Sequence, residues 1–350
     1  MCQHCSTQTH SSPEGDRQGV AFTPFQYKQH ISQISMPVSA NMTPSEIRRF
    51  MDFNQLRRSH FGRVAIFSST RLLISLVKFR PFTTMSEVKV NQWDELSQFL
   101  FRKTRFTNLI ATNGALLEGF IFAIGWRECS TKNEQFGLYG SLRKIENAKN
   151  ELRNQGANLN LVGFILGQSL QYVGDNLFEK IQNCYKSLGV PSFDQIKYEA
   201  DIPANQGAFG FASALTFTIN GFKNAPHVDE DAFLYASGWW FQDDKQTSQI
   251  QRDASKQCKG GNFIFPNEHF WIDLSKCLGP IQVVWARSKF AHYTDPEQEN
   301  KSKKLVGMSA QCSSRSAKTM CQKSHGYYEV GKRVGYQIRD GNTISSQLKE

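Results

Sequence analysis

Short apolar segments separated by glycine and proline follow one another from Pro191 onward, and this pattern constrains the fold more than any other feature of the chain. The segments are rich in β-branched and aromatic residues, which favour strands. Asn220-Gly221 is typical of a hairpin turn. So many short strands in succession predict a β-sandwich or jelly-roll core. The predicted strands span residues 215–219, 236–241, 262–265, 270–274, 281–285 and 305–309.

A mainly helical region is predicted before this core. Thr43-Pro44-Ser45-Glu46 suits a helix start, because a hydroxyl cap precedes Pro in the first turn and Glu follows. Residues 92–101, 141–154, 159–170 and 176–188 also have helical character. We therefore expect an α+β chain with four parts. These are a disordered tail over 1–40, a helical support region over 41–195, the β core over 196–325, and a second tail over 326–350.

The formal net charge of the chain is +10, which favours polyanionic partners such as nucleic acid. A basic surface without a specific partner is the alternative. Clustered cations in the first part of the chain can contact phosphates, or they can form a solvated helix face. They are Arg48, Arg49, Arg57, Arg58, Arg63, Arg71, Lys78 and Arg80.

Eight cysteines are scattered along the chain without the spacing of a disulfide framework. Cys2 and Cys5, with His4 and His10 nearby, could hold zinc, but no second pair completes such a site and a disordered end is the expected state. The first residues contain no apolar signal region, and no segment is long enough to span a membrane. We therefore expect an intracellular protein with reduced thiols and no membrane partner.

His227 and Asp229 lie two residues apart just after a predicted strand. Side chains with this spacing point to the same face of an extended segment. Two imidazoles and one carboxylate can bind one face of an Fe(II) ion and leave the opposite face open for a co-substrate and O₂. His292 follows the 281–285 strand and would supply the second imidazole. We therefore predict that His227, Asp229 and His292 are metal ligands.

Other residues compete for these roles, since an H-x-D pair alone is a weak signal. His269 is a rival for the distal ligand, although its Phe and Trp neighbours also suit a core or edge position. Asp231 falls on the same strand face as His227 but farther from it, and Glu230 points the other way. The plainest alternative is a set of histidines satisfied by hydrogen bonds, with no metal.

Five motifs follow one another over roughly residues 200–320. They are Asn224-Ala225-Pro226-His227-Val228-Asp229, Gly260-Gly261-Asn262-Phe263-Ile264-Phe265, Trp271-Ile272-Asp273-Leu274, Trp285-Ala286-Arg287-Ser288 with His292-Tyr293-Thr294, and Val306-Gly307-Met308-Ser309-Ala310-Gln311. In this order they resemble the TET/JBP group of 2-oxoglutarate- and Fe(II)-dependent dioxygenases, and especially its fungal, transposon-associated branch. The resemblance implies a double-stranded β-helix that binds Fe(II) through the predicted triad, with 2-oxoglutarate as co-substrate. It also implies oxidation of the 5-methyl group of a pyrimidine base that is flipped out of DNA.

The far carboxylate of a dicarboxylate co-substrate needs a cation at a fixed reach. The family usually places an Arg before the last core strand, and Lys304 occupies the corresponding position here. Arg315, which follows that strand, is a rival because guanidinium binds carboxylates with two parallel hydrogen bonds. A solvated turn over residues 301–304 is the remaining interpretation.

We therefore expect a monomeric, nuclear dioxygenase that uses Fe(II), 2-oxoglutarate and O₂ to oxidise 5-methylcytosine in DNA. One alternative is a relative that has lost turnover and only binds nucleic acid. Another is an oxygenase that acts on a protein or a small molecule. Trp239, Trp240, Phe263 and Phe265 would line the pocket or stack on a base, or they would be ordinary core residues.

Overall fold

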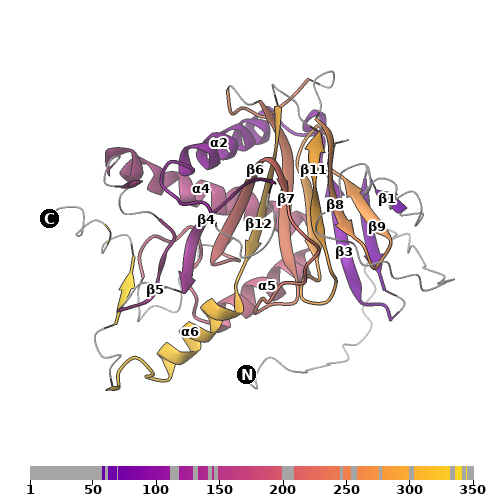
Figure 1. Cartoon of the computed structure of the whole chain (residues 1–350). Helices are drawn as coiled ribbons and strands as arrows, with labels where there is room; N and C mark the ends of the chain where they lie inside the picture. Colours follow the sequence, from indigo (N-terminus) through magenta and orange to yellow (C-terminus); the bar gives the residue numbers. More distant parts are fainter. Residues whose placement is uncertain are drawn as a thin grey trace.

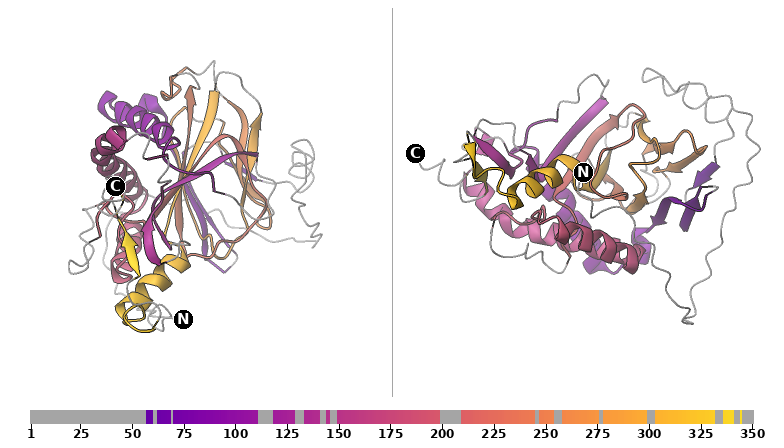
Figure 2. Two further views of the ribbon diagram at one scale, coloured as in Figure 1. Left: turned by 60° about the vertical axis from the view of Figure 1, so that its left-hand side comes forward. Right: turned by 90° about the horizontal axis from the view of Figure 1, so that it is seen from below.

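Two β-sheets face one another in the computed structural model, and helices cover the outer face of the larger sheet (Figures 1 and 2). The structure describes residues 57–59, 62–68, 70–110, 118–128, 133–140, 144–145, 149–198, 209–244, 247–253, 258–275, 278–298, 303–331, 336–340 and 344. The predicted tail over 1–40, including Cys2 and Cys5, lies outside these residues, as does most of the helix predicted from residue 43.

The larger sheet has nine strands in the order β13-β5-β4-β6-β12-β7-β10-β3-β2. Neighbours in this sheet are antiparallel except β13 and β5, which pair in parallel. The bounds of its strands are β2 Arg63–Phe67, β3 Leu73–Phe79, β4 Glu118–Glu128, β5 Glu134–Leu138, β6 Ala214–Lys223, β7 Ala236–Asp244, β10 Ile281–Trp285, β12 Lys303–Gln311 and β13 Gln337–Arg339.

The smaller sheet has the order β1-β9-β8-β11, with β1 parallel to β9 and the other pairs antiparallel. Its strands are β1 Arg57–Ser59, β8 Lys259–Phe265, β9 Phe270–Asp273 and β11 Tyr293–Gln298. His227 extends this sheet, because it forms an antiparallel bridge with His292 at the start of β11.

From β6 to β12 the chain passes back and forth between the two sheets. It runs from β6 in the larger sheet to His227 beside the smaller one, then to β7, to β8 and β9, to β10, to β11, and finally to β12. Four strands of the larger sheet, β6, β12, β7 and β10, therefore face four segments of the smaller one. This is the double-stranded β-helix, or jelly roll, and it confirms the predicted fold class.

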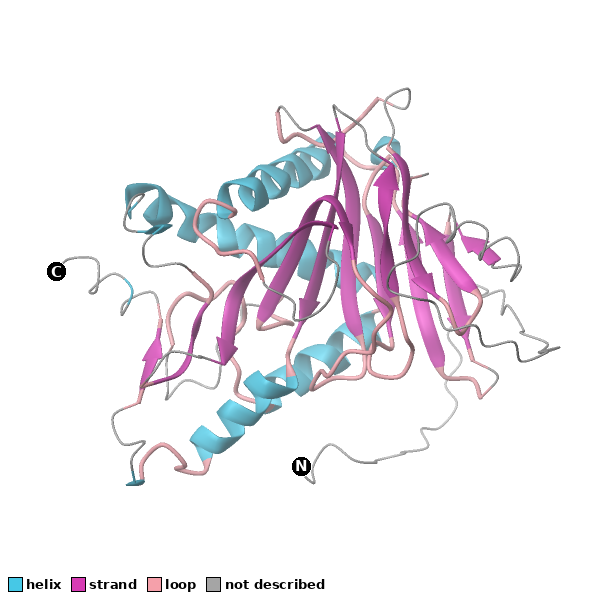
Figure 3. Cartoon of the chain, viewed as in Figure 1, coloured by secondary structure: helices cyan, strands magenta, loops and turns pink. Residues whose placement is uncertain are grey.

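Three helices cover the larger sheet on the face away from the smaller sheet (Figure 3). They are α2 (Glu87–Lys103), α4 (Lys149–Val173) and α5 (Asp175–Ser187). In α2 the buried residues Val90, Trp93, Leu96 and Leu100 recur every three or four positions, the spacing that places side chains on one helix face. A short 3-10 turn, η2 (Phe82–Thr84), precedes α2, and α6 (Ser314–Ser324) follows β12.

Strand β7 separates two apolar cores. Its first eight residues are all buried, because both faces of the strand are covered. Trp239 packs into the core between the sheet and the helices, whereas the next residue, Trp240, packs into the core between the two sheets. Successive side chains of a strand point to opposite faces, so neighbouring tryptophans anchor different cores.

The strand predictions for the second part of the chain are confirmed as β6, β7, β8, β9, β10 and β12. The predicted helices at 92–101 and 159–170 lie within α2 and α4, and the helix predicted at 176–188 corresponds to α5, which ends one residue earlier. The region 41–195 is helical only in part, however, because it also contains β1 to β5. Strands β3 and β4 complete the larger sheet by pairing with β10 and β6, which are far away in the sequence. The proposed domain boundaries stay a prediction, and β13 lies inside the segment expected to be a tail.

None of the helices in the described part of the chain has both the length and the apolar composition that crossing a bilayer requires.

The helix layer is expected to contribute substantially to stability. Leu166 in α4 has no exposed surface, so Leu166→Ala should lower the free energy of unfolding by about 2–5 kcal/mol through lost burial and a residual cavity. Gln171→Ala, on the exposed side of the same helix, should change it by less than about 0.5 kcal/mol. Denaturant unfolding measures both values. Equal effects of the two substitutions would contradict the placement of α4 against the sheet.

Candidate metal centre and its cavity

Reciprocal backbone hydrogen bonds join His227 to His292. The His227 N–H donates to the His292 carbonyl at 3.1 Å, and the His292 N–H donates to the His227 carbonyl at 3.0 Å. The two ring centroids consequently lie 4.7 Å apart. Asp229, two residues after His227, projects toward the same point, and its backbone N–H donates to the carbonyl of Arg287 at 3.1 Å.

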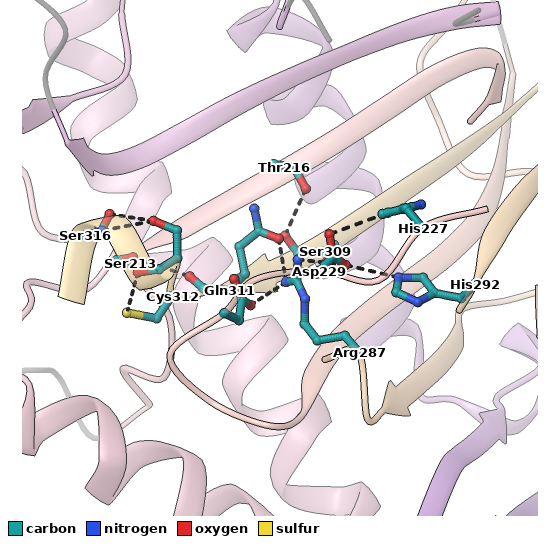
Figure 4. A network of polar contacts seen from close by, with 12 residues as sticks. Ser213, Thr216, His227, Asp229, Arg287, His292, Ser309, Gln311, Cys312 and Ser316 are labelled. Atoms are coloured by element: carbon teal, nitrogen blue, oxygen red, sulfur yellow. Dashed lines mark hydrogen bonds and ion pairs between the residues drawn. The ribbon is translucent and has the colours of Figure 1, made fainter. Parts of the chain in front are cut away.

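Three potential ligand groups converge at this place, as Figure 4 shows. Nε2 of His227 lies 3.5 Å from Oδ1 of Asp229, and Nε2 of His292 lies 3.1 Å from Oδ2 of the same carboxylate. Ligand atoms of the three residues all lie within 4.8 Å of one another. The structure therefore brings together the three residues that the sequence singled out.

The hydrogen bonds of the two imidazoles define which nitrogen is available to a metal. Nδ1 of His227 lies 2.9 Å from the carbonyl oxygen of Ala225, and Nδ1 of His292 lies 3.0 Å from that of Phe290. A carbonyl oxygen only accepts hydrogen bonds, so each Nδ1 carries the proton. In the neutral rings, both Nε2 lone pairs then face a carboxylate. Three electron-rich groups in this arrangement fit a divalent cation.

Arg287 pairs with the same carboxylate oxygen of Asp229 that lies beside His292. Its guanidinium pairs with Oδ2 of Asp229 at 2.8 Å and with Oδ2 of Asp231 at 2.5 Å, and it donates to Oε1 of Gln311 at 2.7 Å. The side chains of Arg287 and Asp231 are both buried. Asp231 is therefore an ion-pair partner of Arg287, and Asp229 is the carboxylate that faces both histidines. No role had been expected for Arg287, whose only sequence signal is a cation just after a strand that is mostly apolar.

The electrostatics of the group keep Asp229 ionised and His292 neutral. Burial would raise the pKa of Asp229, but its contacts with His227 and His292 and the charge of Arg287 outweigh burial and hold this pKa well below its usual range. Burial lowers the pKa of His292, which keeps the ring neutral and able to bind a metal. Burial raises the pKa of Asp231 to about 7, against the opposing charge of Arg287.

A cavity of about 390 Å³ opens onto this centre between the two sheets. Its volume is in the range of small-molecule sites. The aromatic part of its wall consists of Phe222, Trp240, Phe263 and Trp285, and the rings of Phe263 and Trp285 both lie 5.5 Å from the His292 ring. The polar part is formed by Thr216, Thr218, Asn224, Thr294, Ser309 and Gln311.

The competing residues are placed elsewhere. His269 lies in the turn between β8 and β9 with a positive φ of 52°, outside the group of converging ligands. Glu230 is exposed. Of the four aromatic residues considered for the pocket, Trp240 and Phe263 line the cavity. Trp239 belongs to the helix-facing core, where its indole N–H donates to Oγ of Ser169 at 3.2 Å.

The two candidate cations for binding the co-substrate lie in different elements of the structure. Lys304 lies in β12, opposite Asp243 of β7 and three residues before Gly307 of the cavity wall, but its side chain is outside the described residues. Arg315 is exposed in the first turn of α6. Among the described residues of the cavity wall, the one cation is Arg287. Because two carboxylates already pair with Arg287, a second cation is needed for a dicarboxylate.

Comparison with known proteins gives a family match. Residues 86–297 match the family described as the Tet-like 2OG-Fe(II) oxygenase superfamily. Among solved structures, the chain is similar to NgTET1 in complex with 5mC DNA, at 8% identity and a TM-score of 0.43, covering 88% of this chain and 100% of that one. It is also similar to a Pseudomonas putida prolyl-4-hydroxylase, at 11% identity and a TM-score of 0.29, covering 76% and 97%. A search of curated proteins finds no match.

The ion pairs of Arg287 are expected to set the affinity for a metal by orienting Asp229. The double variant Arg287→Gln/Asp231→Asn leaves the net charge unchanged, because one positive and one negative charge are lost together. It should nevertheless weaken Fe(II) binding by about 10- to 100-fold, the usual effect of losing a group that orients a ligand. Anaerobic Fe(II) titration followed by calorimetry measures the affinity, and circular dichroism checks the fold. An unchanged affinity in a folded variant would show that Asp229 needs no such support.

Proposed function

The chain belongs to the Tet-like 2OG-Fe(II) oxygenase superfamily, and on this basis we propose that it oxidises the 5-methyl group of 5-methylcytosine in DNA. Its cofactors are Fe(II), 2-oxoglutarate and O₂, as in the family. The finer assignment, to the fungal, transposon-associated branch, is part of the proposal and rests on the order and spacing of the motifs around His227 and His292.

We propose His227, Asp229 and His292 as the iron ligands. The observation that carries this proposal is the convergence of two deprotonated Nε2 atoms and one carboxylate within 4.8 Å. When bound, Fe(II) with 2-oxoglutarate and O₂ supplies the oxidising power that places one oxygen atom in a C–H bond and the other in succinate, with release of CO₂. The two imidazoles and the carboxylate would hold the ion from one side and would leave the side toward the cavity for the reactants.

The remaining residues position these groups and limit access of water. The rings of Phe263 and Trp285 pack around His292, whose side chain is almost fully buried, and hold the imidazole in one orientation. His227 is more accessible, with 38% of its side chain exposed. The centre is therefore closed on the His292 side and open on the His227 side, where a large substrate could approach.

The cavity wall suits a polar co-substrate. The indole N–H of Trp240 has no hydrogen-bond acceptor in the described part of the protein, and the hydroxyls of Thr216, Thr218 and Ser309 belong to the same wall. The indole N–H and the Ser309 hydroxyl offer donors to carboxylate oxygens. The hydroxyls of Thr216 and Thr218 donate instead to the backbone carbonyls of Ser309 and Gly307. A cation is still needed for the far carboxylate, and we propose Lys304 at the beginning of β12, with Arg315 as the weaker alternative.

DNA as the substrate is supported by the family and by the charge of the chain. The net charge of +10 attracts polyanions at long range. We also propose that the protein works in the nucleus, where such a substrate resides, and that it acts as a monomer.

Turnover is expected to depend on the triad. His227→Ala and Asp229→Ala should each abolish formation of succinate from 2-oxoglutarate, because the iron loses a ligand and is no longer held beside the cavity. His269→Ala is the matched control, since this imidazole lies outside the converging group, and it should retain succinate formation. Mass spectrometry of succinate measures all three. Persisting turnover in both triad variants would reject the assignment of the ligands.

The substrate is tested separately with duplex DNA that contains 5-methylcytosine. Nucleoside mass spectrometry should detect 5-hydroxymethylcytosine only when Fe(II) and 2-oxoglutarate are both present. Succinate formation without any oxidised base would leave the reaction class intact and point to a protein or a small molecule as substrate. Binding of DNA without either product would point to a relative that has lost turnover.

The anchor for the co-substrate is expected to be a single lysine. Lys304→Ala should weaken 2-oxoglutarate binding by about tenfold or more, because a hydrogen bond to a charged group contributes about 1.5–3 kcal/mol. Arg315→Ala removes the same charge from the exposed start of α6 and should leave the affinity within about twofold. Calorimetric titration of 2-oxoglutarate into the iron-loaded protein measures both. The reverse order of effects would assign the role to Arg315.

A further inference from the structure

Three cations surround an exposed tyrosine on the helix-covered side of the larger sheet. Nζ of Lys89 lies 4.7 Å from the centre of the Tyr172 ring, and Cζ of Arg80 lies 5.5 Å from it. Nζ of Lys78 donates to the backbone carbonyl of Tyr172 at 3.3 Å. The tyrosine itself is 51% exposed. We call Lys78, Arg80, Lys89 and Tyr172 the Tyr172 cluster.

The cluster is assembled from three separate parts of the chain. Lys78 belongs to β3, Arg80 follows the end of that strand, Lys89 lies in the first turns of α2, and Tyr172 is in the last turn of α4. Contacts with the ring and with the helix carbonyl hold the cations in defined positions, so little side-chain entropy remains to be lost when an anion binds. The cluster is therefore preorganised.

No carboxylate among the described side chains pairs with the cluster. In the described part of the protein, Lys78, Arg80 and Lys89 take part in no ion pair. The acidic residues of α2 that lie nearest in sequence, Glu87 and Asp94, pair with Arg252 instead, each at 2.8 Å. The C-terminal end of α4 contributes only about half a negative charge, which is far less than three positive charges.

Mutual repulsion among these cations is visible at Lys78. Burial lowers the pKa of this lysine, and the charges of Arg80, Arg63 and Lys89 lower it further. Arg63, which pairs with Lys78 across the β2–β3 ladder, adds to the positive potential and donates to the carbonyl of Val173 at the end of α4. An arrangement of this kind costs stability unless an anion relieves it.

The Tyr172 cluster is separate from the cavity. Lys78 lies opposite Gln282 of β10, and the Gln282 side chain accepts a hydrogen bond from Ser169 of α4 at 2.8 Å. This face of the sheet therefore belongs to the helix layer. The cavity residues Trp240 and Trp285 lie on the opposite face, in the core between the two sheets. An anion bound at the cluster could not be the one that reacts at the metal centre.

We propose that the Tyr172 cluster is a second DNA-contacting surface, which binds the phosphate backbone of duplex DNA away from the reacting base. The inference rests on the proposed function for the choice of DNA, and on the unpaired charges for the choice of site. Phosphate oxygens are suitable acceptors for lysine and arginine, and such contacts position a protein on a duplex without reading its sequence. The surface would hold flanking or neighbouring DNA while another segment reaches the cavity.

The experiment compares two triple variants with the same loss of charge. Lys78→Gln/Arg80→Gln/Lys89→Gln removes the cluster, and Lys180→Gln/Lys186→Gln/Lys318→Gln removes three exposed lysines of α5 and α6. Fluorescence anisotropy of a short unmethylated duplex, without iron or co-substrate, gives the dissociation constant at several salt concentrations. The cluster variant should bind about tenfold or more weakly, and the slope of log K against log salt should fall by about two to three.

The control variant should lose much less affinity and keep most of its salt slope. Equal losses in both variants would mean that binding follows net charge alone, and no loss in the cluster variant would exclude the surface; either result overturns the proposal. If the cluster variant does not fold by circular dichroism, the single substitution Lys89→Gln is measured against Lys180→Gln, and it should reduce the salt slope by about one.

Anionic lipid is tested as a competing partner with vesicles of phosphatidylserine and phosphatidylcholine. Vesicle binding that disappears in the cluster variant, while DNA binding is unchanged, would overturn the choice of DNA. Because DNA binding is measured without turnover, a negative result for this surface does not affect the assignment of the metal ligands. Likewise, succinate formation that persists in the triad variants would not affect the assignment of this surface.

Discussion

The pair of backbone hydrogen bonds between His227 and His292 is the constraint on which the site depends. It joins two segments that are distant in sequence, and it places their imidazoles side by side with Nε2 directed at Asp229. These bonds are made by the backbone alone, so the sheet itself brings the two imidazoles and the carboxylate together. The electron-rich centre is thus built by the sheet and not by the metal.

Strand β7 and its neighbours divide the molecule into two environments. The inner face of the larger sheet carries aromatic residues and the cavity, and there Arg287 pairs with both Asp229 and Asp231. The outer face carries the helices, and at its edge the Tyr172 cluster keeps its positive charge unbalanced. Buried charges must be paired, whereas charges near solvent can remain available to a partner.

Local sequence patterns were sufficient to predict most strands in the second part of the chain. Strands β6 to β10 and β12 were recognisable because β-branched and aromatic residues occur in short runs between turn residues. The helices α2 and α5 were recognisable from their apolar spacing. Strands β3 and β4 were not, because a short apolar run suits a strand or a buried helix equally well. What makes each of them a strand is an edge of the sheet, supplied by β10 or β6.

The amino-acid order was enough to identify the pairing of His227 with Asp229, because a spacing of two on an extended segment is a local property of the backbone. For the second histidine ligand, it favoured His292 over His269 only through the order of the motifs along the chain. Strand pairing places Arg287 against both Asp229 and Asp231. Strand pairing and helix packing together bring three cations to Tyr172, namely Lys78, Arg80 and Lys89. Contacts of that kind join residues whose separation along the chain carries no periodic signal, so they exist only once the sheets and helices have assembled.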